Sequence, residues 1–317
     1  MADTDAKYEA SKDKRLILSP SNISIYTLCP FAYYLRYIEH ERVPVSLNLV
    51  FGSEIHKMLK EFYKKDFKSS ESFVNYWRHR WKSAIAGDFL KGKEKELLNT
   101  RLINYNLKKE DGSIEIKIGD HIRFLDDELK GYFSYRNLGD SILRRFYERH
   151  KGKNDPVHTE KRFSFDFRSF KIRGVIDRID RNEKGVYITD YKTDKSNPKE
   201  NPSLLHNNVQ LTIYSAAYRS IFREDERAIL FYHLRSGDAI ITKRSDKDFD
   251  CLEKICETVS ENILKENFVP HYGSHCKFCD YIQPCNGYSY NNEGPIKIED
   301  NEIKNGADIW NFIDQEF

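Results

Sequence analysis

The sequence has no long apolar run, and its positive and negative side chains are almost equal in number. No stretch approaches the roughly 18 consecutive apolar residues that a membrane-spanning helix needs. The start MADTDAKYEASKDKR is polar and lacks the apolar core of a signal peptide, so we expect a cytoplasmic, intracellular protein with no membrane partner. Lysine and arginine number 52 and the acidic residues 50, a net charge of +2. Any nucleic-acid-binding surface must therefore be a local patch.

Cysteine is scarce, and a phosphate-binding loop is missing. Six cysteines in 317 residues are too few for a disulfide scaffold, and thiols stay reduced inside cells. No segment matches the GxxxxGK(S/T) loop of ATP-driven motors, so we expect no intrinsic motor activity. Repeats and low-complexity tracts are also absent. The hydrophobic content of 39% is enough for the core of one large domain or two ordinary ones.

Apolar spacing divides the chain into helical and strand-forming parts. Residues 18–64 and 65–155 show helical spacing, in the second range only in patches among many charged and aromatic residues. From Val157 the apolar residues alternate with polar ones, which predicts three successive antiparallel strands over 157–192. The same spacing arguments predict, in order, a helix over 204–222, a hairpin over 226–244 and a helix over 249–268.

The middle strands carry two acids and a lysine around a short polar turn. Asp190 follows Asp177 by 13 positions (190 − 177 = 13), so a five-residue turn and a modest splay of the strands bring their carboxylates together. Lys192 points to the same face as Asp190 because side chains alternate along a strand. Converging carboxylates repel unless a cation lies between them, and bound Mg²⁺ or Mn²⁺ stabilises charge in a phosphoryl transfer. On spacing alone, a surface hairpin with solvated acid–base pairs is an equal alternative.

Three short motifs place this hairpin in a wider context. They are G-V-I-D at 174–177, D-Y-K at 190–192 and Q-L-T-I-Y at 210–214. Through them the chain resembles the RecB-like nuclease branch of the PD-(D/E)XK superfamily. The resemblance implies an α/β fold with a restriction-endonuclease-like core, in which a mixed sheet is flanked by helices. Two departures are Ile176 in place of the proline that names the superfamily, and Asp190 where many members have glutamate.

The resemblance also implies roles for single residues. The catalytic set would be Lys192, Asp177, Asp190, Gln210 and Tyr214, and the metal ligands would be Asp177, Asp190, the backbone carbonyl of Tyr191 and His56. Gln210 and Tyr214 form an i, i+4 pair on one helical face, as contacts to substrate and active site require.

His56 enters this set through the segment G-S-E-I-H at 52–56, which resembles an upstream G-x-x-x-H element of RecB-like nucleases. The resemblance makes its imidazole a metal ligand, and a nitrogen ligand would favour Mn²⁺. Taken alone, a helical histidine is more often packed or solvated. Glu160 resembles an auxiliary acid of relatives, although a strand glutamate is more often solvated.

Four of the cysteines are spaced as a distinct group. Cys276, Cys279 and Cys285 form a C-x₂-C-x₅-C array that begins 247 positions after Cys29 (276 − 29 = 247). This asymmetric set resembles the iron–sulfur staple of RecB-like nucleases, including the AddB-type and CRISPR-adaptation branches. The resemblance implies a structural 4Fe–4S cluster that ties the two ends of the chain together. A Zn²⁺ site in the same thiolates is an alternative, and free buried cysteines are another.

The resulting hypothesis is a metal-dependent DNA nuclease, expected as an exonuclease on single-stranded ends in DNA repair, recombination or CRISPR adaptation. The alternative is a non-catalytic nucleic-acid-binding or assembly subunit of a helicase–nuclease or integration complex. A helicase or integrase is then the expected partner protein. A strand-binding surface is predicted from the basic and aromatic residues Arg78, Arg80, Trp77 and Trp81, unless that helix packs its tryptophans inside.

The expected domain organisation follows from these assignments. It comprises a flexible arm (1–17), the N-terminal part of the nuclease domain (18–64), a helical insertion or subdomain (65–155), the nuclease core with the cysteine cluster (156–290) and an acidic tail (291–317). Cys251 and Cys256 are expected to be small buried apolar residues of the helix over 249–268.

Overall fold

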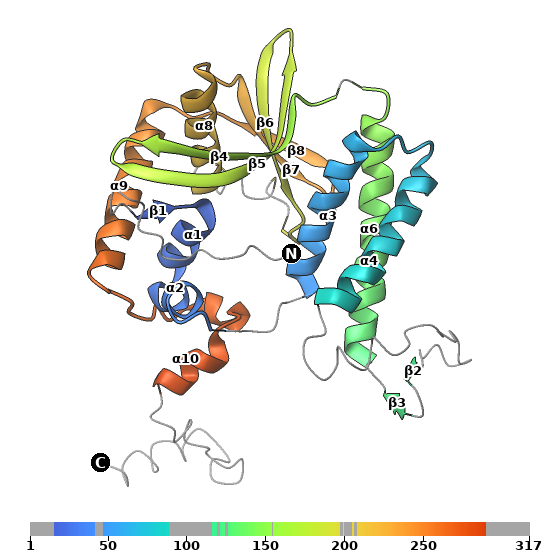
Figure 1. Cartoon of the computed structure of the whole chain (residues 1–317), viewed down its shortest axis with the longest axis horizontal. Helices are drawn as coiled ribbons and strands as arrows, with labels where there is room; N and C mark the ends of the chain where they lie inside the picture. Colours follow the sequence, from blue (N-terminus) through green and yellow to red (C-terminus); the bar gives the residue numbers. More distant parts are fainter. Residues whose placement is uncertain are drawn as a thin grey trace, which may run out of the picture.

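The computed structural model describes residues 16–41, 47–88, 116–118, 121–123, 126–153, 155–196, 199, 205 and 208–289. Within them, a six-stranded mixed sheet is flanked by helices (Figure 1). The strand order is β1-β5-β6-β7-β8, and β4 pairs with β5 beside this path. None of the described helices is long and apolar enough to cross a membrane. The predicted arm, apart from its last two residues, and the whole predicted tail lie outside the described residues.

Three long strands form the centre of the sheet. They are β4 (His158–Phe167), β5 (Phe170–Asn182) and β6 (Gly185–Lys192), which pair antiparallel as predicted. Asn182 pairs with Gly185, so the turn between β5 and β6 is shorter than the five residues expected. The remaining strands are β1 (Ile17–Leu18), parallel to β5, β7 (Ala228–His233), parallel to β6, and β8 (Asp238–Thr242), antiparallel to β7.

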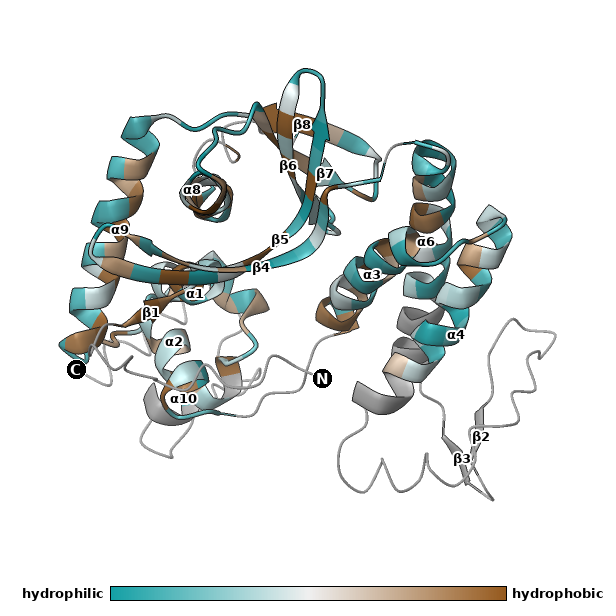
Figure 2. Cartoon of the chain, turned by 45° about the horizontal axis from the view of Figure 1, so that its top comes forward, coloured by the Kyte–Doolittle hydropathy of each residue, from teal (hydrophilic) through white to brown (hydrophobic). Residues whose placement is uncertain are grey.

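The β4–β5 pair curves around helix α8, Val209–Phe222 (Figure 2). Phe163, Phe165 and Phe167 of β4 are buried in the core that this curve encloses, as the alternating pattern predicts. Gly174 of β5 lies opposite Phe163, and a Cβ there would come within 2.6 Å of the phenylalanine ring. The glycine of G-V-I-D therefore allows the ring to pack against the strand.

Two helices at the start of the described chain meet at Cys29. They are α1 (Pro20–Leu28) and α2 (Pro30–Tyr37), and α1 packs on α8 and on α9 (Asp246–Leu264). Pro30 disfavours helical backbone in the residue before it, and Cys29 is extended, with φ −157° and ψ 109°. Cys29 therefore lies at the break between two helices and not on the face of a helix. Near it lie the short 3₁₀ helix η2 (Ser274–Phe278) and α10 (Ile282–Ser289).

A second helical group packs on β6 and β7. It consists of α3 (Leu47–Lys64), α4 (Ser70–Asp88) and α6 (Asp126–His150), whose apolar faces form a core with Tyr191 and Tyr232. Within the range 65–155, where helical patches are predicted, residues 121–123 instead pair as strand β3 (His121–Arg123) with β2 (Ile116–Ile118).

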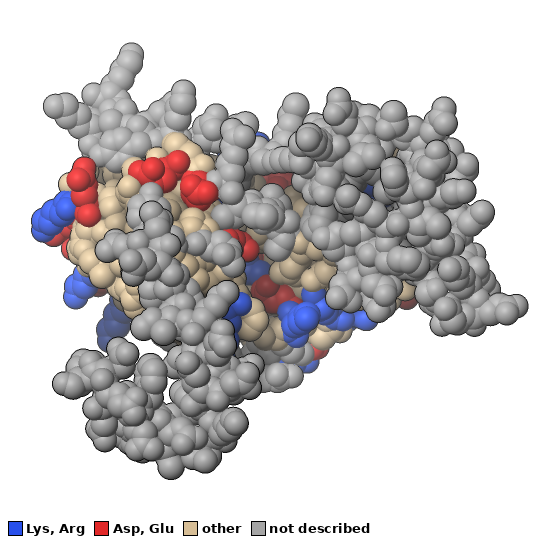
Figure 3. Space-filling view, turned by 90° about the horizontal axis from the view of Figure 1, so that it is seen from below, with Lys and Arg blue, Asp and Glu red and all other residues tan. Residues whose placement is uncertain are grey.

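The predicted strand-binding surface on α4 is wrong for its aromatic members. Trp77 and Trp81 are fully buried in this core, and the indole of Trp77 donates to the carbonyl of Arg136 at 3.1 Å. Arg78 pairs with Asp140 at 2.7 Å, and Arg80 pairs with the buried Glu54 at 2.9 Å. The tryptophans therefore serve packing, which is the alternative that the helical pattern also allows. On the face seen in Figure 3, described side chains of both charge signs are present.

Candidate active site

Strands β5 and β6 separate where the two acids lie. Their last pair on this side is Arg178 with Thr189, and Asp177 and Asp190, which come next in register, do not pair. Instead, the backbone N–H of Tyr191 donates to Asp177 Oδ2 at 2.8 Å. Both acids are buried, Asp190 completely. The splay expected from the sequence therefore encloses the two carboxylates in a fork between the strands.

Glu160 of β4 faces the same fork from the other side of β5. Thr159 pairs with Arg178 and Lys161 with Ile176, which leaves Glu160 opposite Asp177 without a ladder pair. Its φ of 51° lies in the left-handed region, which costs a glutamate about 1–3 kcal/mol and is concentrated at functional sites. The β4 backbone is thus distorted at Glu160, the β4 residue that faces the fork.

His56 of α3 reaches the fork from the second helical group. Its Nδ1 lies 3.4 Å from Asp177 Oδ1 and 4.0 Å from Glu160 Oε1. Its Nε2 lies 3.1 Å from the carbonyl oxygen of Tyr191, and only a protonated Nε2 can donate there. The imidazole therefore contacts three of the residues that converge on the fork.

Lys192 and α8 complete the arrangement. The ammonium of Lys192 lies 2.9 Å from Asp190 Oδ2 and donates to Gln210 Oε1 at 2.8 Å. Gln210 in turn donates to the hydroxyl of Tyr214 at 2.7 Å, one helical turn later. Asn208 accepts the backbone N–H of Leu211 at 3.1 Å and so fixes the start of α8. All the residues predicted for the site therefore lie together.

The two acids of the fork differ in their pKa. Burial raises the pKa of Asp190 to about 6, since the attraction of Lys192 offsets only part of the desolvation and the charge of Asp177 opposes ionisation. Burial acts in the same direction on Asp177, but the charge and hydrogen bond of His56 outweigh it and lower the pKa of Asp177. Asp177 is the acid that remains ionised at lower pH.

The two bases of the fork are held as cations. Burial lowers the pKa of His56, but the charge of Asp177 and its hydrogen bond, followed by Asp190 and Glu160, raise it to about 9. Burial also disfavours the charged form of Lys192, and Asp190 outweighs this and raises the pKa of the ammonium. The surplus of carboxylates thus creates a negative potential that attracts cations.

The donor set fits a divalent cation. Carboxylate oxygens, a backbone carbonyl and an imidazole nitrogen are ordinary ligands for such ions. Ligand atoms of His56, Glu160 and Asp177 lie within 4.8 Å of one another, which no other such group in the described part of the chain achieves. Asp190 Oδ2 is buried without a hydrogen bond of its own, and its close contact is the Lys192 ammonium. An oxygen in this state suits a metal ligand.

The four predicted cluster cysteines line one small cavity of about 20 Å³. The backbone of His271 joins two of them, since its N–H lies 3.5 Å from the sulfur of Cys29 and its carbonyl 3.8 Å from that of Cys276. A four-thiolate zinc site with Zn–S bonds of about 2.3 Å places its sulfurs about 3.8 Å apart. Among the described residues, no three of these sulfurs come within 4.8 Å of one another. The spacing is therefore wider than a zinc site requires.

The prediction for the remaining two cysteines is half wrong. Cys256 is fully buried in the core under α9, as expected. Cys251 is exposed, because it lies five residues earlier on α9 and faces away from the sheet's core. It lines a surface groove with α1 residues instead.

A known protein family matches the part of the chain that carries the fork. The model of the PD-(D/E)XK nuclease superfamily matches residues 17–286, which is most of the chain. The chain belongs to this superfamily. The matched range contains the whole fork, α8 and the four cysteines, so membership in the PD-(D/E)XK nuclease superfamily rests on one continuous domain match.

One curated relative extends the comparison. The chain is 25% identical over 281 residues to an ATP-dependent helicase/deoxyribonuclease subunit of Clostridium perfringens (strain SM101 / Type A). The alignment covers 82% of this chain and 22% of that protein, so this chain spans about a fifth of the relative's length. The crystal structure of SSO0001 aligns with a TM-score of 0.29 at 15% identity, over 50% of this chain and 80% of that one, a similarity too low to support an argument.

Two residues at the fork or behind it are hard to find in the sequence. The strand pattern favours a solvated Glu160, although counting the β4–β5 register places it opposite Asp177. Arg178 was missed. Its guanidinium grips Asp180 at 2.6–2.9 Å and donates to the hydroxyls of Tyr63 and Tyr191 behind the fork. No short motif identifies Arg178, because the two tyrosines that it contacts come from other elements, α3 and β6.

Replacing His56 by alanine is expected to weaken Mn²⁺ binding about 10- to 100-fold and to remove its pH dependence between pH 7 and 9. A protonated imidazole cannot bind a metal, and the pKa of His56 is about 9, so the wild-type affinity should rise about tenfold per pH unit up to that pH. Asp190, with a pKa of about 6, is already ionised there. Calorimetric Mn²⁺ titrations at several pH values measure both effects.

Lys57→Ala is the matched control for this variant, because Lys57 of α3 pairs with Glu54 and lies outside the fork. Its metal affinity and pH dependence should equal those of the wild type. If His56→Ala gives the same result as the control, the imidazole only packs beside Asp177.

Proposed function

We propose that the protein is a metal-dependent deoxyribonuclease, working as an exonuclease on single-stranded DNA ends in repair, recombination or CRISPR adaptation. The observation that carries the proposal is the fork, where buried carboxylates, an imidazole and an ammonium are in contact. Superfamily membership supports phosphodiester hydrolysis. The similarity to a helicase/deoxyribonuclease subunit supports DNA as the substrate.

The proposed metal is Mg²⁺ or Mn²⁺, and the imidazole ligand favours Mn²⁺. The residues that would hold it are His56, Glu160, Asp177, Asp190 and the carbonyl of Tyr191. When bound, the cation supplies positive charge that stabilises the transition state of phosphoryl transfer. The hydrogen bond from the Tyr191 N–H fixes the Asp177 carboxylate for this purpose.

Lys192 orients the attacking water in this proposal. An ammonium has three donors, and the contacts to Asp190 and Gln210 use two of them among the described residues. The third can hold a water or a phosphate oxygen at the fork. Gln210 is itself held by Tyr214, so α8 fixes the direction of the lysine side chain.

For the cysteines we propose a 4Fe–4S cluster held by Cys29, Cys276, Cys279 and Cys285, with Zn²⁺ as the alternative. The shared cavity supports a common metal centre for the four cysteines, and their spacing in the sequence resembles the iron–sulfur staple of RecB-like nucleases. The proposed partner is a helicase, which the name of the relative supports, or an integrase.

The alternative function is a non-catalytic nucleic-acid-binding or assembly subunit. Such a protein is expected to have lost an acid or the lysine of the site. Asp177, Asp190 and Lys192 are all present, and the last two are in direct contact. The arrangement therefore favours catalysis over a purely structural role.

The proposal is tested with end-labelled single-stranded and double-stranded DNA in Mg²⁺ or Mn²⁺. We expect single strands to be shortened from their ends, faster in Mn²⁺, with no cleavage in EDTA. Circular single-stranded DNA is the control, and it should survive if free ends are required. No cleavage of any substrate by protein with both metal sites loaded would contradict the proposed activity, and cleavage of circles would contradict the requirement for ends.

A further inference from the structure

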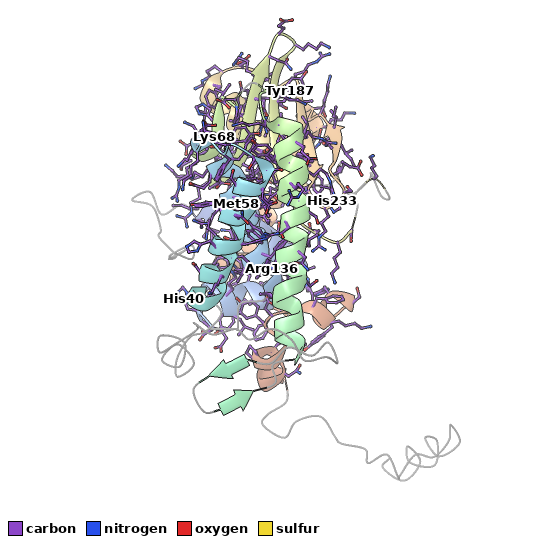
Figure 4. The ribbon with its side chains drawn as sticks, turned by 90° about the vertical axis from the view of Figure 1, so that its right-hand side faces the viewer. His40, Met58, Lys68, Arg136, Tyr187 and His233 are labelled. Atoms are coloured by element: carbon purple, nitrogen blue, oxygen red, sulfur yellow. The ribbon has the colours of Figure 1, made fainter. Side chains whose placement is uncertain are left out.

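The turn between β7 and β8, residues 234–237, is held by two arginines of α6. Arg145 donates to the carbonyl of Arg235 at 2.6 Å and to that of Leu234 at 3.4 Å. Arg149, one helical turn later, donates to the carbonyl of Gly237 and to the hydroxyl of Tyr232. Figure 4 shows His233, the last residue of β7, beside α6. Helix α6, which belongs to the insertion predicted over residues 65–155, is thus hydrogen-bonded to the backbone of this turn at one end of the sheet.

The same turn holds the main chain that follows the site lysine. The N–H of Leu234 donates to the carbonyl of Lys192 at 2.8 Å, and the guanidinium of Arg235 donates to the carbonyl of Thr193 at 2.6 Å. His233 Nε2 lies 2.8 Å from the carbonyl of Asp194. Three successive carbonyls after β6 are therefore fixed by residues of the β7 end and its turn.

The turn is shaped to receive Arg145. Gly237 has a φ of +77°, which glycine adopts without strain. A Cβ at this position would lie 2.8 Å from Cδ of Arg145. A side chain at 237 would therefore both strain the turn and displace the arginine, so the glycine and the arginine fit as a pair.

We propose that α6 is a positioning element of the reaction, in which Arg145 and Arg149 clamp the 234–237 turn and so hold Lys192 in place. This inference rests on the proposed function. Arg145 and Arg149 touch neither fork acid, so they are positioning residues and not catalytic ones. A displacement of about 1 Å at a reacting group can lower a rate about a hundredfold, which makes a remote clamp on the lysine strand consequential.

The test compares Arg145→Ala with Arg144→Ala. Arg144 is the adjacent residue of α6, and it donates to Glu71 and Ser70 of α4, within the insertion itself. For Arg145→Ala we expect kcat to fall about 10- to 100-fold, with KM for DNA and the affinity for Mn²⁺ unchanged. Arg145→Lys should recover part of the loss, because an ammonium can still donate to one turn carbonyl. Arg144→Ala should keep the wild-type kcat.

Amide hydrogen exchange over residues 190–194 provides a readout that does not depend on activity. It should be faster in Arg145→Ala than in Arg144→Ala. Equal exchange in the two variants, or faster exchange with unchanged kcat, would overturn the clamp. An equal fall of kcat in both variants would also overturn it, since loosening of the whole insertion would then suffice. If Arg145→Ala does not fold, Arg145→Lys replaces it in the same comparison. An inactive wild-type protein would instead contradict the proposed function.

Discussion

Asp190→Asn is expected to lower kcat for DNA cleavage at least about a thousandfold, with DNA binding and folding retained. Such a factor corresponds to about 4 kcal/mol, in the range of the several kcal/mol that a bound metal supplies to charge stabilisation. The carboxylate lies in the fork and contacts Lys192 at 2.9 Å. The amide keeps the shape of the side chain but loses its charge. Single-turnover kinetics on end-labelled DNA measure the loss.

Asp190 is fully buried, and burial raises its pKa to about 6, so its negative charge destabilises the folded state. Asp190→Asn removes that charge, and we therefore expect the variant to fold. Lys192→Ala should have a similar effect on kcat through the lost orientation of the water. Asp166→Asn is the matched control, since Asp166 is an exposed acid on the neighbouring strand β4. Near wild-type turnover in Asp190→Asn or Lys192→Ala would remove these residues from the proposed mechanism.

Cys279→Ala is expected to remove the iron and to lower the midpoint of thermal unfolding by at least about 10 °C. Cluster binding to the folded chain contributes directly to folding, and a loss of about 5 kcal/mol shifts the midpoint of a domain this size by about 10–20 °C. Protein purified without oxygen should be brown, absorb broadly at about 400 nm and contain about four irons per chain. Activity should fall with stability, because the cavity lies apart from the fork.

Cys251→Ala is the matched control, because Cys251 is exposed on α9 and outside the cysteine cavity. It should retain iron, colour and unfolding midpoint. If the wild-type protein is colourless and contains one zinc ion per chain, the proposed cluster is wrong and the four cysteines bind Zn²⁺. If the wild-type protein contains neither iron nor zinc, and a variant with all four cysteines replaced by alanine is equally stable, both metals are removed from the proposal.

Short-range patterns predicted the strands that carry the fork. The alternating phenylalanines of β4 and the spacing of Asp177 and Asp190 are local features, and the antiparallel β4-β5-β6 order confirms them. The proximity of His56 to Asp177, 121 positions apart (177 − 56 = 121), was expected only through the family resemblance, and the structure places them 3.4 Å apart.

Features that depend on packing between distant segments were not predictable in this way. The pattern of α4 is equally compatible with an exposed or a buried tryptophan face, and the choice depends on α6, which packs on it. Arg178 and Arg145 bond to partners whose approach is set by the whole fold. The left-handed backbone of Glu160 is likewise not revealed by any residue type in the sequence, because glutamate does not favour that conformation.

The cavity of four cysteines has a consequence for the order of events during translation. Cys276 is synthesised 247 residues after Cys29, which at about 5–20 residues per second takes about 12–50 s. During that interval Cys29 has been synthesised but the other three cysteines have not. Any ion or cluster that needs all four must be loaded after the ribosome has passed Cys285. Its presence would therefore mark chains that were translated through the entire fork and folded, and would be missing from prematurely terminated ones.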